Sequence, residues 1–105
     1  MEDKTMCKDE ALRRIKTVQK EIAQLGVSSL GLFGSFVKNT QTDSSDVDIL
    51  VEFLPGQHSF DNFMELAFLL ERVLERKVDL VTRIALSPYI GPHILKEVEN
   101  VPLIA

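Results

Sequence analysis

The segment from Asp46 to Phe53 constrains the fold more than any other stretch of the chain. Apolar and polar side chains alternate along it, which predicts a β-strand with one packed face. The side chains of that face are Val47, Ile49, Val51 and Phe53. The opposite face begins with the carboxylates of Asp46 and Asp48, although Asp is disfavoured in strands. Because two like charges on one face repel each other, their burial costs free energy unless a cation lies between them. The segment therefore predicts a packed sheet together with a metal site.

Apolar spacing and turn residues predict the elements on either side of this strand. Residues 9–25 have a one-sided helical pattern that ends at Gly26, a common type of helix stop. Ser59 is a good N-cap for a helix that runs to about Glu75, with Asp61 in its first turn. The wide apolar arc of this helix predicts burial on more than one side, or a partner surface. The other predicted elements are strands over 27–33 and 78–82, a short helix over 35–38, a loop over 39–45, a turn over 87–90 and a helix over 92–98.

Length and composition bound the class of protein. A chain of 105 residues fits a single domain, which we expect to span residues 1–105. The formal net charge of −4 argues against a nucleic-acid grip, which needs clustered Lys and Arg, but it permits a nucleotide held through metal ions. No apolar run approaches the roughly 20 residues of a membrane helix. Cys7 is the only cysteine, so a disulfide within the chain is excluded and a reducing cytoplasm is predicted.

A second group of residues indicates phosphate binding. Gly34 permits a close approach of the backbone to a phosphate, and a helix that begins at Ser35 would offer N–H donors to it. Lys38 lies one helical turn further on and could neutralise phosphate charge. Asp79, on the polar face of the predicted strand 78–82, could join the two acids of the earlier strand. Three carboxylates could hold two divalent ions that clamp the attacking and leaving oxygens of a displacement at phosphorus.

Each of these features has an ordinary explanation when it is taken alone. Gly-Ser pairs are common in turns, an acidic pair can mark a solvated strand entry, and Asp79 can be a surface acid. His58 and His93 have no acidic or cysteine partner at ligand spacing, so we expect ordinary surface positions for both. The joint occurrence of the acids and the Gly34-Ser35 turn in this order, with matching strand faces, favours a metal–nucleotide site.

These residues resemble the minimal nucleotidyltransferase domain of the polymerase-beta-like nucleotidyltransferase superfamily. The resemblance is carried by Gly34-Ser35, ten intervening residues, Asp46-x-Asp48, and Asp79 on a later strand, and it covers most of the chain. It implies an α/β (α+β) domain with a small mixed sheet and helices packed on one face. Many members have Arg-Gly where this chain has Lys38-Asn39. Lys binds phosphate less well than Arg, because it lacks the planar guanidinium group that forms two parallel hydrogen bonds.

The resemblance also implies a chemistry and a partner. Mg²⁺, as two ions, is expected on the three catalytic carboxylates Asp46, Asp48 and Asp79, and the phosphates of ATP on Gly34 and Ser35. An acceptor hydroxyl would attack the α-phosphorus and release pyrophosphate, with Asp79 helping to deprotonate the acceptor. Members commonly pair with a HEPN-domain toxin. The implied role is therefore that of an antitoxin in a type VII-like toxin–antitoxin pair, which adds AMP to a tyrosine of the toxin.

Two other functions are left open by the sequence. The domain could be a binding module that neutralises its partner by covering it, which the apolar arc of the helix 60–75 and the apolar tail from Val101 favour. Nucleotide transfer to RNA or to a small molecule is the weaker alternative, because the chain is short and acidic. The apolar surfaces also predict a complex, either with the partner or with further copies of the chain.

Overall fold

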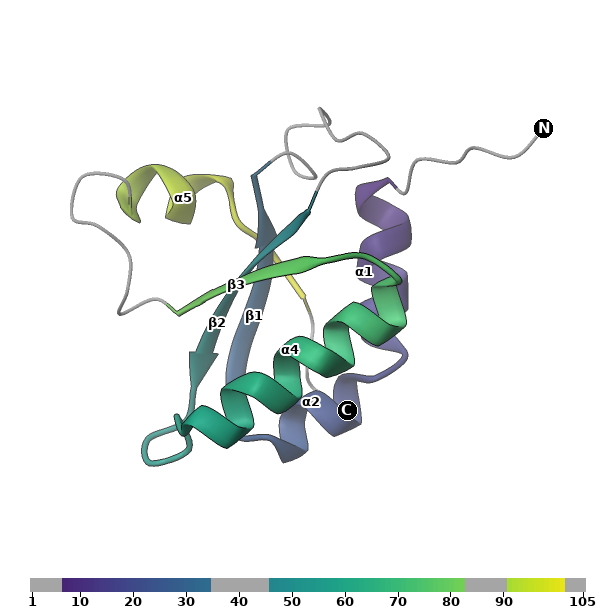
Figure 1. Cartoon of the computed structure of the whole chain (residues 1–105). Helices are drawn as coiled ribbons and strands as arrows, with labels where there is room; N and C mark the ends of the chain where they lie inside the picture. The colour runs from purple at the N-terminus through teal and green to yellow at the C-terminus, as the bar shows by residue number, and fades with distance from the viewer. Residues whose placement is uncertain (1–6, 35–45, 83–90, 102–105) are drawn as a thin grey trace.

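The computed structural model describes residues 7–34, 46–82 and 91–101, which form a four-stranded mixed sheet with helices against it (Figure 1). The strands stand in the order β3-β2-β1-β4. The helices are α1 (Lys8–Lys16), α2 (Gln19–Gln24), α4 (Phe60–Leu74) and α5 (Gly91–Glu97). The strands are β1 (Val27–Phe33), β2 (Val47–Phe53), β3 (Val78–Thr82) and β4 (Glu99–Asn100). The predicted α/β fold with a small mixed sheet is confirmed.

The directions of the strands follow from the connections between them. β1 runs antiparallel to β2, and β4 runs antiparallel to β1. β2 and β3 are parallel, and α4 forms the crossover that parallel neighbours need. The first residues of β2 and β3 therefore lie at the same edge of the sheet, which decides where the acids of the two strands meet.

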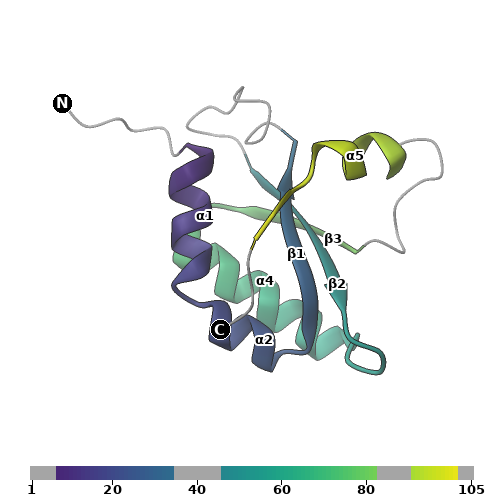
Figure 2. The ribbon, with the colours of Figure 1, turned by 180° about the vertical axis from the view of Figure 1, so that it is seen from behind.

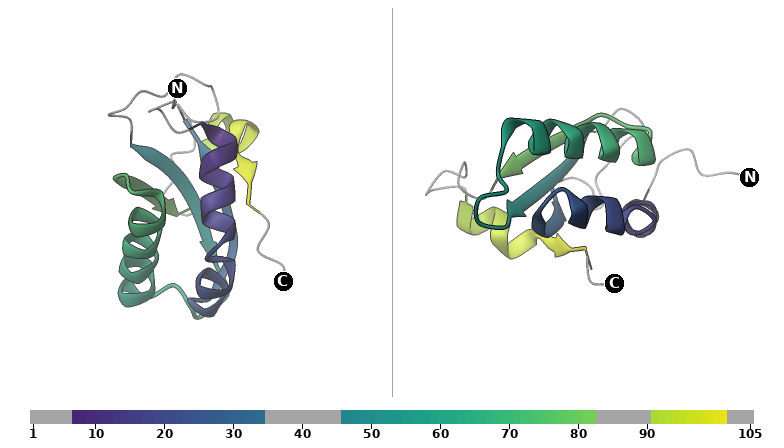
Figure 3. Two further views of the ribbon diagram at one scale, coloured as in Figure 1. Left: turned by 90° about the vertical axis from the view of Figure 1, so that its right-hand side faces the viewer. Right: turned by 90° about the horizontal axis from the view of Figure 1, so that it is seen from below.

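Apolar side chains between the sheet and α1, α2 and α4 form the core. α1 lies beside the last turns of α4 (Figures 1 and 3). The packed face of β2 contributes as predicted, because Val47, Ile49 and Val51 are fully buried. Each such side chain contributes roughly 1.5–3 kcal/mol when it leaves water. The other large side chains that are fully buried are Ile15, Ile22, Leu30, Leu32, Leu66, Leu70 and Leu74.

The prediction of one helix over residues 9–25 is wrong in one respect. The segment forms two helices, α1 and α2, which are separated at Thr17 and Val18. The hydroxyl of Thr17 donates a hydrogen bond of 2.6 Å to the carbonyl oxygen of Arg14, and the Val18 N–H donates to the carbonyl oxygen of Ile15. These bonds form a tighter turn, as happens where a Thr side chain competes for a backbone carbonyl. Ile15 and Ile22 are buried on either side of the break, so the apolar spacing continues through it.

The face of the sheet that carries the acids is partly covered by the segment from α5 to β4. Of this segment, α5 stands apart from the other helices (Figure 2). Gly31 of β1 lies under Val98, and a Cβ atom at Gly31 would overlap a methyl group of Val98. Leu50 is only 8% exposed, although it shares this face with Asp48 and Glu52. The predicted polar face of β2 is therefore polar at its two ends and covered in its middle.

The boundaries of α4 agree with the prediction from its N-cap. The Ser59 hydroxyl accepts a hydrogen bond of 3.1 Å from the Asn62 N–H, and Glu75 ends the helix with a φ of 54°. With 15 residues α4 is the longest described helix, and no helix in the described ranges is long and apolar enough to cross a bilayer. The predictions for 35–38, 39–45 and 87–90 lie outside the described residues.

Candidate active site

Three carboxylates gather at the edge of the sheet where β2 and β3 begin. Asp46 directly precedes β2, and Asp48 and Asp79 are the second residues of β2 and β3. The parallel register places Asp48 directly beside Asp79. A hydrogen bond of 2.9 Å from the Val47 N–H to the Lys77 carbonyl oxygen begins this pairing. Because neighbouring strands lie about 4.8 Å apart, the two acidic side chains leave the same face of the sheet as close neighbours.

The charges of these acids act on one another. Asp48 is partly buried, whereas Asp46 and Asp79 are exposed. Burial raises the pKa of the Asp48 carboxyl above its ordinary value of 3.8, and the negative charges of Asp79 and Asp46 raise the pKa further. The ionised form of Asp48 is therefore disfavoured in the folded protein unless a positive charge joins it.

The chemistry of these donors fits Mg²⁺, a hard cation that takes carboxylate oxygens. A cation at this edge would relieve the repulsion that raises the pKa of Asp48. Within the part of the chain that the structure describes, no three His, Cys, Asp or Glu side chains already surround a point where a metal ion would fit. Sharing an ion would therefore require the repelling carboxylates to turn toward one another. The metal assignment to Asp46, Asp48 and Asp79 stays a prediction.

Gly34 follows β1 and lies against Asp48. Its φ of 76° is in the left-handed region that favours glycine. A Cβ atom at this position would overlap the Asp48 carboxylate. The sequence predicts a close approach of the Gly34 backbone to phosphate, and in the structure the missing side chain also makes room for an acid. Ser35 and Lys38, the other residues predicted to bind the nucleotide, lie outside the described residues.

One supporting residue was missed by the sequence reasoning. Glu71, in the last turn of α4, accepts a hydrogen bond of 3.2 Å from the Val78 N–H. Val78 begins β3 and precedes Asp79, so the Glu71 carboxylate fixes the backbone that carries this acid. Arg14 of α1 holds the end of α4 through a bond of 3.2 Å to the Leu74 carbonyl oxygen. In the sequence, Glu71 differs from the other acids of α4 only in lying close to the strand that follows the helix.

Replacing Glu71 by Ala is expected to lower the free energy of unfolding by about 1–2 kcal/mol, because the Val78 N–H loses its acceptor. Urea denaturation measures the change. The matched control is Glu65→Ala at an exposed position of the same helix, for which we expect a change below about 0.5 kcal/mol. Equal effects of the two substitutions would contradict a supporting role for Glu71.

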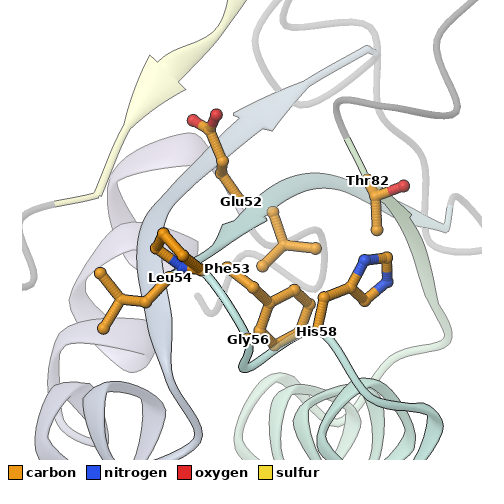
Figure 4. A pocket seen from close by; sticks show the side chains of 8 residues that line it. Glu52, Phe53, Leu54, Gly56, His58 and Thr82 are labelled. Atoms are coloured by element: carbon orange, nitrogen blue, oxygen red, sulfur yellow. The ribbon is translucent and has the colours of Figure 1, made fainter.

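A pocket of about 490 Å³ opens at the other end of β2 (Figure 4). It lies between the ends of β2 and β3 and the turn over 54–58. His58 is exposed, as predicted, and its ring stacks on that of Phe53 at a centroid distance of 5.1 Å. Roughly 17 Å of strand separate Phe53 from Asp48, so the pocket is not part of the acidic site.

Comparison with known proteins decides the family. The profile of the nucleotidyltransferase domain matches residues 12–101. The chain belongs to this family. The resemblance to minimal nucleotidyltransferases is thus confirmed, and the enzyme class is that of a nucleotidyltransferase.

Two relatives cover most of this nucleotidyltransferase. It is 38% identical over 92 residues to "Putative protein adenylyltransferase MJ1379" of Methanocaldococcus jannaschii, with 87% of each chain covered. It is 41% identical over 83 residues to protein adenylyltransferase MntA of Thermococcus cleftensis, with 76% of this chain and 81% of the relative covered.

Solved structures share the fold of this nucleotidyltransferase. The structure of a "putative minimal nucleotidyltransferase" superposes with a TM-score of 0.78 at 28% identity, covering 90% of this chain and 95% of that one. A chain in the complex of tri-AMPylated Shewanella oneidensis HEPN toxin with MNT antitoxin superposes with a TM-score of 0.54 at 22% identity, covering 83% and 71%. At that identity the second match is a likeness of fold alone.

Proposed function

We propose that this nucleotidyltransferase, acting as a single domain over residues 1–105, transfers AMP from ATP to a hydroxyl of a partner protein. The pairing of Asp48 with Asp79, beside Asp46 and against Gly34, is the observation that carries the proposal. The names of the relatives support a protein as acceptor. The complex of an AMPylated HEPN toxin with MNT antitoxin supports a HEPN toxin as partner. A tyrosine hydroxyl as acceptor and a cytoplasmic location are further parts of the proposal, as expected from the sequence.

In this proposal the three carboxylates would hold two Mg²⁺ ions. Gly34, Ser35 and Lys38 would bind the triphosphate of ATP. Bound Mg²⁺ would neutralise phosphate charge and stabilise the charge that develops during transfer. The acceptor oxygen forms a bond to the α-phosphorus, and the bond from that phosphorus to the oxygen of the leaving pyrophosphate breaks. The proton of the acceptor hydroxyl passes to the Asp79 carboxylate.

The test uses ATP labelled either at the α-phosphate or at the γ-phosphate, with Mg²⁺ and the purified protein encoded beside this chain. Label from the α-phosphate is expected on the partner, whereas label from the γ-phosphate is expected in pyrophosphate only. The variant Asp46→Asn/Asp48→Asn should leave the partner unlabelled, and Asp61→Asn, an exposed acid at the start of α4, should label it normally. Equal labelling by the double acid variant would refute the proposal.

Neutralisation by binding alone is the second candidate function. It is favoured by exposed apolar side chains on α4, where Phe60 and Phe68 are 77% and 62% exposed. The same double acid variant separates the two functions in cells that express the partner. Rescue of growth by this variant at the wild-type level would favour binding alone, and loss of rescue would favour transfer.

A further inference from the structure

One stripe of α4 points away from the core and is apolar along most of its length. Phe60, Met64, Phe68 and Arg72 recur at intervals of four, so they lie on one side of the helix. Phe60 and Phe68 are largely exposed, and Met64 is partly buried. Two exposed Phe side chains on one helix face are uncommon on a surface that only meets water.

A groove of about 340 Å³ lies beside Phe68, between α2 and α4. Leu25 and Leu69 contribute its apolar part. Its rim is acidic, because Glu21 of α2 and Glu65 of α4 line it against the single cation Arg72. A ligand with apolar side chains and adjacent basic groups would therefore complement this groove.

We infer that this groove docks an amphipathic helix of the partner protein, with apolar residues over Phe68 and Lys or Arg facing Glu21 and Glu65. The inference rests on the proposed function for the existence of that partner. A second copy of this chain fits less well, because it has a net charge of −4 and would place acids against acids. Phe68 lies about 9 Å along α4 from Leu74, in the helix layer on the face of the sheet opposite to the acids.

Isothermal titration with the purified protein encoded beside this chain tests the inference. Phe68→Ser is expected to raise the Kd at least about tenfold, as the loss of a central aromatic anchor does. Glu65→Lys is expected to raise the Kd about threefold to tenfold, with a larger effect at low salt. The matched control is Leu95→Ser, a 41% exposed apolar residue on α5, which should bind like the wild type. Thermal melts of each variant check the fold.

The outcomes separate docking from chemistry. A partner that binds the wild type but receives no AMP refutes the proposed transfer, while a dependence of the Kd on Phe68 still supports the groove. Binding of Phe68→Ser at the wild-type Kd, or no binding of the wild type, overturns the docking inference. Sedimentation analysis provides a further check. A dimer of this chain that Phe68→Ser dissociates would make a second copy the occupant and would also overturn the inference.

Discussion

The Asp48→Asn variant is expected to lose nucleotidyl transfer by at least about 10²–10³-fold, while its metal-free form becomes more stable than the wild type. Asn keeps the size of Asp but brings no negative charge to a cation. It also removes the charge that Asp79 and Asp46 repel. Relief of one like-charge pair between neighbouring strands is worth about 0.2–1 kcal/mol in the free energy of unfolding.

The gain in stability should depend on pH. Since the pKa of Asp48 is raised in the folded state, the folded wild type binds more protons than the unfolded chain between pH 3.8 and the raised value. The free energy of unfolding of the wild type therefore falls as the pH rises through this window, and the variant lacks this contribution. Urea denaturation with EDTA across a pH series measures the difference, which should be smallest below pH 3.8 and constant above the raised pKa.

Two observations would contradict this account of Asp48. One is a metal-free wild type that is more stable than the variant at neutral pH. The other is an equal stabilisation of both proteins by added Mg²⁺ and ATP, since a ligand stabilises only a folded state that binds it. Asp61→Asn serves again as the control, because Asp61 lies on α4 outside the acidic edge.

Replacing Gly34 by Ala is expected to impair both stability and nucleotide binding. An alanine at this position would have to adopt a positive φ, which costs about 1–2 kcal/mol. Its Cβ atom would also overlap the Asp48 carboxylate. Displacing that carboxylate adds about 1–3 kcal/mol, as overpacking does, and moves a proposed metal ligand. Binding of ATP with Mg²⁺ should therefore weaken by at least about tenfold, as measured by calorimetry.

Gly56→Ala is a matched control for Gly34→Ala. Gly56 has a similar φ of 80°, but a Cβ atom there would meet nothing within 4 Å. This substitution should therefore cost only the conformational part, about 1–2 kcal/mol, and should leave nucleotide binding unchanged. If the two variants bind ATP equally well, the contact between Gly34 and Asp48 has no part in the site.

The strands and α4 could be predicted because each has a strong local signal. The alternation of apolar and polar residues predicted the strand that carries Asp48, and Ser59 as N-cap predicted the start of α4. The break at Thr17 could not be predicted, because a hydrogen bond from its side chain interrupts the helix without disturbing the apolar spacing. β4 was missed because its two residues are polar and exposed, and only backbone pairing with β1 makes them a strand.

The candidate site was predicted in its residue types but not in its geometry. Strand faces indicated that the acids of two strands could meet, yet the parallel register that places Asp48 beside Asp79 depends on the crossover through α4. The contact of Gly34 with Asp48 and the bond from Val78 to Glu71 join residues that are distant in sequence. Burial of Leu50 on the acidic face likewise depends on α5, which packs there from the far end of the chain.

Asp48 and Asp79 are paired in the register of β2 and β3, so a shift of one strand changes the distance between their carboxylates in steps of one residue. A slip of β3 by one residue would turn Asp79 to the opposite side of the sheet and expose Leu80, and a slip by two would carry it almost 7 Å along the strand. A shift of strand register therefore cannot change the distance between these groups by small increments. A change that shifts the register of β3 is therefore expected to abolish the pairing of the two acids rather than to tune it.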